Sequence, residues 1–100
     1  MPWRRFVVAD RSMEPTLVAG QGLIGRTTRR ARQGELRCVE HPQRPGFWLV
    51  KRVASVDDGG ATMRIVSDNV DVDAVDSRVF GPVQVAGSYR VVLRVPRRFM

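Results

Sequence analysis

Ser12 lies in the stretch ADRSMEPTLVAG, residues 9 to 20, and could act as a nucleophile if a base stood beside it. Pro15 cannot continue a strand or a helix, and Gly20 loosens the end of the segment. The segment is therefore predicted to be a bent loop. A loop serine is commonly a turn former or a helix cap, so any chemistry depends on a partner elsewhere in the chain.

Lys51 is the only lysine among 17 basic residues and is the strongest candidate for that base. Arginine stays protonated at ordinary pH, whereas a lysine removed from water can lose its proton. In the strand-like stretch FWLVKRVASV, alternation places Lys51 on one face with Leu49 and Val53 and turns Arg52 to the opposite face. Burial among apolar neighbours disfavours the ammonium form, so we expect the pKa of Lys51 to be lowered.

The elements that must position these two residues are predicted to be strands. Six segments rich in β-branched and aromatic residues follow one another, at 6–8, 22–28, 35–41, 47–56, 61–67 and 88–95. Turn signals separate them, and Asp-Asp-Gly-Gly at 57–60 predicts a hairpin between the fourth and the fifth. The predicted fold class is mostly β: a single small domain over residues 1–100, with a twisted antiparallel sheet folded toward a barrel.

The composition limits the classes of partner. A hydrophobic fraction of 43% indicates a folded chain, and its longest apolar runs are too short to cross a bilayer. The net charge of +7 predicts attraction to acidic groups, including peripheral contact with anionic surfaces. The densest basic run, residues 26–37, holds no aromatic residue for base stacking and no nucleic-acid-binding signature. We expect this run to be a solvated loop, and we expect no specific nucleic acid partner.

Cys38 and His41 are each the only residue of their kind. A single cysteine forms no intrachain disulfide, and in ELRCVEH it is expected to be a buried structural thiol. One Cys and one His are too few for a conventional structural zinc site, so no metal and no organic cofactor is expected. A Ser-His-Asp triad would need His41, which lies in the turn EHPQRP and is expected to be solvated. No signal peptide or membrane anchor is recognisable, which predicts a cytoplasmic protein.

Three segments resemble the ordered boxes of the type I signal peptidases, whose Ser/Lys chemistry and β fold the self-cleaving SOS repressors share. These segments are SMEPTL at 12–17, VKRV at 50–53 and SDNVDVDAVDSRVFGPV at 67–83. The resemblance covers the chain from about residue 10 to about residue 95. It implies a serine endopeptidase whose catalytic dyad is Ser12 and Lys51.

The same resemblance implies roles for residues around the dyad. Met13 and Pro15 would shape the nucleophile loop. The last segment would support the site through Asp68, Asn69, Asp76, Ser77 and Arg78. An ion pair between Asp76 and Arg78 is expected to brace that segment.

The chain departs from this family at three points. The first is that signal peptidases have an N-terminal membrane anchor, whereas none is recognisable in this sequence. Asp10 stands where the family often has Gly or Ser, two positions before the nucleophile. An ionised carboxylate cannot donate a hydrogen bond, so the backbone N–H of Ser12 is expected to carry more of the oxyanion stabilisation. Ala74 stands where the family often has a serine that orients the lysine amine. Another group is therefore expected to hold Lys51, either a backbone carbonyl or Ser77.

A short, arginine-rich chain without an anchor is similar to one subgroup, the nickel-type superoxide dismutase maturation proteases. That similarity implies removal of the N-terminal propeptide of a dismutase precursor, whose N-terminal segment would be the protein substrate. Two alternatives stay open. One is signal peptidase I-type cleavage of exported preproteins, and the other is a non-catalytic basic β-domain that binds nucleic acid or an acidic protein.

Overall fold

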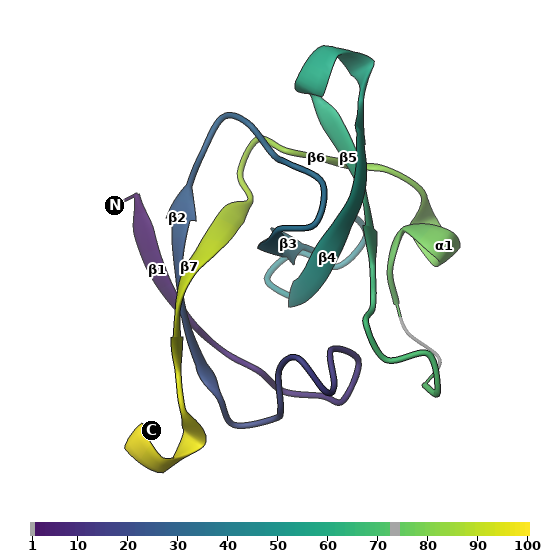
Figure 1. The fold of residues 1–100 in the computed structure, drawn as a ribbon. Helices are drawn as coiled ribbons and strands as arrows, with labels where there is room; N and C mark the ends of the chain where they lie inside the picture. Colours follow the sequence, from purple (N-terminus) through teal and green to yellow (C-terminus); the bar gives the residue numbers. More distant parts are fainter. Residues whose placement is uncertain (1, 73–74) are drawn as a thin grey trace.

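The computed structural model describes residues 2–72 and 75–100, and its strands form one antiparallel sheet (Figure 1). The strands are β1 (Trp3–Val7), β2 (Gly22–Thr27), β3 (Leu36–Glu40), β4 (Trp48–Asp57), β5 (Thr62–Val66), β6 (Val83–Gln84) and β7 (Tyr89–Val95). Their order across the sheet is β1-β2-β7-β3-β4-β5-β6. The described strands leave β1 and β6 as edges, so the sheet is not closed into a barrel.

The predicted mostly-β class is confirmed, and each of the six predicted segments overlaps a strand, although β1 begins three residues before the first segment. The predicted hairpin is β4–β5, in which Asp57 pairs with Thr62 across a short 3-10 turn, η1 (Asp58–Gly60). The two-residue strand β6 was not predicted, because alternation cannot be read over so short a segment. The other helical segments in the described ranges are α1 (Ser77–Phe80) and η2 (Arg97–Phe99).

The central strands β3 and β4 contribute to two apolar clusters. One cluster lies beside β5 and β6 and consists of Val39, Leu49, Val53, Met63, Ile65, Val83 and Val85. The other consists of Val8, Met13, Leu17, Leu23, Leu36 and Cys38. Strict alternation along the first half of β4 buries every second residue, which places Lys51 between two buried apolar residues of that strand.

The loop between β1 and β2 is anchored in the second of these clusters. Met13 and Leu17 are fully buried, and Leu17 N–H donates to the carbonyl of Met13 at 2.9 Å. The four-residue spacing of one helical turn brings both side chains to the same side of the loop. Apolar burial thus fixes the segment that carries Ser12, even though it contains no regular element.

Arg37 corrects the expectation that the whole basic run at 26–37 is solvated, because its side chain is fully buried. Its guanidinium donates to Ser88 Oγ at 2.9 Å, to Thr28 Oγ1 at 2.7 Å and to Glu35 Oε1 at 3.0 Å. A buried guanidinium is tolerated when its charge is paired and its N–H groups are bonded. Arg37 therefore links β3 to the turn before β7.

His41 is not solvated as expected, since only 8% of its surface is exposed. Its ring packs edge-on against Phe47 and Phe80, and its Nδ1 accepts a hydrogen bond from the backbone N–H of Gln43 at 3.0 Å. Cys38 is buried as predicted, and burial raises the pKa of its thiol to about 12. Among the residues that the structure describes, no helix is long and apolar enough to cross a membrane.

Candidate active site

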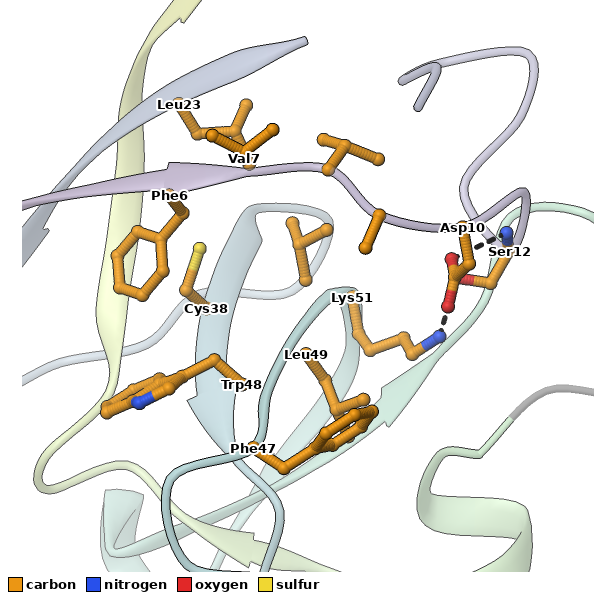
Figure 2. Close-up of a pocket in the computed structure, with 13 residues that line it drawn as sticks. Phe6, Val7, Asp10, Ser12, Leu23, Cys38, Phe47, Trp48, Leu49 and Lys51 are labelled. Atoms are coloured by element: carbon orange, nitrogen blue, oxygen red, sulfur yellow. Dashed lines mark hydrogen bonds between the residues drawn. The ribbon is translucent and has the colours of Figure 1, made fainter. Parts of the chain in front are cut away.

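Ser12, in the first part of the loop between β1 and β2, meets Lys51 of β4, although the two residues are 39 positions apart in the chain. The Lys51 amine donates to Ser12 Oγ at 2.7 Å, and Figure 2 shows the lysine side chain reaching from β4 toward Ser12. Only 2% of Lys51 and 5% of Ser12 is exposed. A catalytic dyad requires hydrogen-bond reach between its two groups, and the structure places Ser12 Oγ and Lys51 Nζ within it. Their arrangement is that of a nucleophile beside a candidate base.

Burial is the largest influence on the Lys51 ammonium and lowers its pKa. Asp10 and Asp76 act in the opposite direction, because their negative charges stabilise the protonated amine. Arg78 adds a smaller repulsion that again favours the neutral form. The net effect is a pKa below that of an ordinary lysine, as the sequence predicts.

Ser67 is a second hydrogen-bond acceptor of the lysine amine. Lys51 Nζ donates to Ser67 Oγ at 2.9 Å, and the serine lies just beyond the end of β5. Among the described residues, Lys51 Nζ donates to Ser12 and Ser67 and to neither of the expected partners, a backbone carbonyl or Ser77. Ser77 Oγ instead accepts a hydrogen bond from the backbone N–H of Ile65 at 2.8 Å. Ala74, the family's usual position for an orienting serine, lies outside the described residues.

Asp10 makes two contacts with the nucleophile that the sequence analysis missed. Its Oδ1 accepts from Ser12 Oγ at 2.8 Å and from the backbone N–H of Ser12 at 3.0 Å. Burial acts to raise the pKa of the Asp10 carboxyl, but these two bonds and the Lys51 charge outweigh it and leave the pKa below its usual value. The Ser12 N–H expected to face an oxyanion is therefore bonded to Asp10 in this structure.

Asp68 and Asn69 tie the nucleophile loop to the sheet. Asp68 accepts from Thr16 Oγ1 and from the Arg52 guanidinium, each at 2.6 Å in its shortest contact. The backbone N–H of Asn69 donates to the Ser12 carbonyl at 2.8 Å, and its side chain donates to the carbonyl of Arg11 at 2.9 Å. These bonds fix the backbone on either side of Ser12 Cα.

Met13 and Pro15 belong to the same loop, as expected. The Met13 sulfur accepts from the backbone N–H of Asp68 at 3.4 Å, and its side chain is buried beneath the loop. Pro15 is exposed at the bend, after a cis peptide bond with Glu14.

Asp76 and its neighbours hold the end of β5, where Ser67 lies. The Asp76 carboxylate is fully buried and caps α1 by accepting from the backbone N–H of Arg78 at 2.9 Å. Its other oxygen accepts from the backbone N–H of Ser67 at 3.0 Å. The predicted pair with the Arg78 guanidinium is present, with a shortest contact of 2.8 Å. Asp76 thus connects α1 to the residue that orients Lys51.

Two hollows flank the dyad, one of about 110 Å³ and one of about 270 Å³. Both are lined by Asp10, Ser12, Phe47, Leu49 and Lys51. The smaller hollow continues between apolar residues of β1, β3 and β4, as Figure 2 shows. The dyad is therefore reached through two recesses with largely apolar linings.

In the described ranges, no group of three or more His, Cys, Asp and Glu residues is placed to hold a metal ion. Comparison of the chain with known protein families, curated proteins and solved structures found no match. The function is therefore inferred from the geometry of this site and from the residues that form it.

Proposed function

We propose that the protein is a serine endopeptidase in which Ser12 is the nucleophile and Lys51 is the general base. The observation that supports this most strongly is the 2.7 Å contact between two buried side chains, Lys51 Nζ and Ser12 Oγ. A buried amine with a lowered pKa gives up its proton at a lower pH than an ordinary lysine does, and no arginine can replace it in that role.

Acylation begins when neutral Lys51 takes the proton of Ser12 Oγ. The oxygen forms a bond to the scissile carbonyl carbon, and the carbonyl electron pair moves onto its oxygen. The C=O bond then re-forms as the C–N bond breaks. The leaving amine takes the proton from Lys51 Nζ, and the acyl group stays on Ser12.

Deacylation repeats these steps with water. Lys51 takes a proton from the attacking water, whose oxygen bonds to the acyl carbon. The bond between that carbon and Ser12 Oγ then breaks, and Lys51 returns the proton to Oγ. Ser67 keeps the amine aimed at the nucleophile during both steps, because its Oγ is bonded to Lys51 Nζ at 2.9 Å.

The proposed substrate is the N-terminal propeptide of a nickel-type superoxide dismutase precursor. The resemblance of segments 12–17, 50–53 and 67–83 to the Ser/Lys peptidases supports the reaction class, and the short arginine-rich chain supports the subgroup. An extended propeptide fits the two recesses beside the dyad and can add main-chain hydrogen bonds at the site. The net charge of +7 would attract an acidic segment of such a substrate.

Incubation with the precursor, followed by mass spectrometry, tests this proposal. We expect one cut, immediately ahead of the metal-binding N-terminus of the mature dismutase, and no cut by the Ser12→Ala variant. If exported preproteins are cleaved and the dismutase precursor stays intact, the result would favour the alternative function, signal peptidase I-type cleavage. Absence of cleavage in both, with nucleic acid or an acidic protein bound, would favour the non-catalytic domain.

A further inference from the structure

Asp10 binds both the hydroxyl and the backbone N–H of Ser12, two groups that the proposed reaction requires to interact with the base and with the oxyanion. A single oxygen, Oδ1, accepts both the Ser12 hydroxyl, at 2.8 Å, and the Ser12 backbone N–H, at 3.0 Å. In acyl transfer the hydroxyl must give its proton to the base, and the N–H of the nucleophile commonly faces the oxyanion. Both groups are turned toward Asp10 instead.

The position of the hydroxyl proton follows from counting donors. An ionised carboxylate can only accept, so the one hydrogen of Ser12 Oγ points toward Asp10. Lys51 Nζ in turn donates to that oxygen. Before Lys51 can accept the proton, the hydroxyl must rotate away from Asp10.

We propose that Asp10 is a positioning residue that holds the free enzyme in a resting state, and that the carbonyl of a bound substrate displaces its carboxylate from Ser12. This inference rests on the proposed function, because it assigns a role within that reaction. The carboxylate has room to move, since Asp10 is exposed and lines both the 110 Å³ hollow and the 270 Å³ hollow. Substrates that fill these hollows should be cleaved fastest, because their binding energy compensates for the loss of the hydrogen bonds between Ser12 and Asp10.

A second effect of the Asp10 charge has to be separated from this one, because the carboxylate also raises the pKa of Lys51. Among the described residues, the other charged groups that act on the amine are Asp76 and Arg78 at α1. Arg37 is the cross-strand partner of Lys51 on β3 and is paired with Glu35. Removal of Asp10 should therefore move the pH–rate curve to lower pH. Only displacement from Ser12 predicts a change in the alkaline plateau, where Lys51 is already neutral.

The test measures acylation of Ser12 by p-nitrophenyl acetate as a burst of nitrophenolate, across pH, in four proteins. They are the wild type, Asp10→Ala, Asp10→Asn and the control Asp57→Ala, which removes an equal charge at the exposed end of β4. We expect the plateau rate of Asp10→Ala to rise roughly tenfold, the effect of losing a charge-assisted hydrogen bond. Asp10→Asn keeps an acceptor oxygen and should rise less, and Asp57→Ala should match the wild type.

A direct readout uses the backbone amide resonance of Ser12 in the wild-type protein. It should titrate with the Asp10 carboxyl in the free enzyme and stop doing so after Ser12 reacts with a serine-directed phosphonate, whose oxygen mimics the oxyanion. An amide that keeps titrating in the adduct overturns the inference, as does a plateau in Asp10→Ala at or below that of the wild type. In those cases Ser12 still reacts and the proposed function stands. If Ser12 reacts with neither reagent, the proposed function falls and the Asp10 role falls with it.

Discussion

Lys51 lies opposite Ser67 because of a single irregularity in the pairing of β4 with β5. If the register set at the hairpin loop continued unbroken, Lys51 would lie opposite Asp68, but the pairing shifts by one residue between Val53 and Ser55. A one-residue shift exchanges the two faces of a strand. The Lys51 amine therefore meets a hydroxyl at 2.9 Å rather than a carboxylate. A carboxylate would stabilise the ammonium, whereas a hydroxyl aims the amine and leaves it free to lose its proton.

Ser67→Ala should lower kcat/KM roughly tenfold, the loss of one hydrogen bond that orients the base. Ser67→Thr keeps the hydroxyl and should restore most of the activity. Steady-state cleavage by both variants, with circular dichroism to verify folding, checks this. Equal activity of Ser67→Ala and the wild type would show that Lys51 is oriented without Ser67.

Lys51→Arg should fold and be nearly inactive. It keeps the positive charge but cannot give up a proton near neutral pH, so we expect a loss of roughly a hundred- to ten-thousand-fold in kcat. Ser12→Ala should be equally impaired, and the double variant little worse, because the two groups act as one unit. Arg64→Lys, on the exposed side of β5, is the control and should leave kcat unchanged. Near-normal turnover by Lys51→Arg would exclude lysine as the base.

Activity should rise with pH and level off once Lys51 is neutral. Burial lowers the pKa of this amine, and Asp10 and Asp76 only partly offset the effect. The midpoint should therefore lie below the ordinary lysine value of about 10.4. A kcat/KM profile from pH 6 to pH 10 measures it, with the unfolding midpoint at each pH as a check on the fold. A flat profile over this range would contradict a lysine base.

The sequence could predict the face of Lys51 because FWLVKRV contains no glycine or proline to interrupt a strand, in which successive side chains point to opposite faces. It could not predict Ser67 as its partner, because the irregularity after Val53 leaves no signature in residue types. Counting residues back from the hairpin loop comes within one residue of Ser67, because it places Asp68 opposite Lys51. The register shift between Val53 and Ser55 accounts for the difference of one residue.

Burial of polar residues was the hardest feature to predict. Arg37 lies in a basic run, and its partner Ser88 is 51 residues away, so nothing local reveals that the guanidinium is enclosed. His41 is buried by the rings of Phe47 and Phe80, of which the second is distant in sequence. The bond from the Ser12 backbone N–H to Asp10 had a signal in the sequence, because aspartate commonly accepts from the N–H two residues on. The bond from the Ser12 hydroxyl depends on the serine rotamer, which residue types do not specify.

Asp76→Asn should lower the free energy of unfolding, and its difference from the wild type should be largest near neutral pH. The buried carboxylate accepts bonds from Ser67 and Arg78, and replacing it should cost roughly 1 to 3 kcal/mol of the free energy of unfolding. Burial acts to raise the pKa of Asp76, but those bonds and the Arg78 charge lower it overall. Its contribution is therefore present above the pKa of an unfolded aspartate, about 3.9, and is lost as pH falls further.

Urea unfolding at pH 7 and at pH 3 measures this difference. The gap between the wild type and Asp76→Asn should narrow at pH 3, because the carboxyl of the unfolded wild-type chain takes up a proton below about pH 3.9, which favours unfolding. Asp57→Asn, exposed at the end of β4, should follow the wild type at both values. A gap that is the same at both values would show that Asp76 acts through its shape and not through its charge.

Burial of Lys51 also ties the appearance of the base to completion of the fold. In a newly made chain the amine is hydrated, keeps its ordinary pKa of about 10.4 and stays protonated. It loses that proton readily only after the nucleophile loop, β4 and the end of β5 have come together, through contacts such as Ser12 with Lys51 and Thr16 with Asp68. Contacts so distant in sequence form late, because loop closure must precede them. An unfinished chain therefore holds a serine and an ammonium ion but no assembled dyad, so the peptidase activity proposed above would begin only in the folded domain.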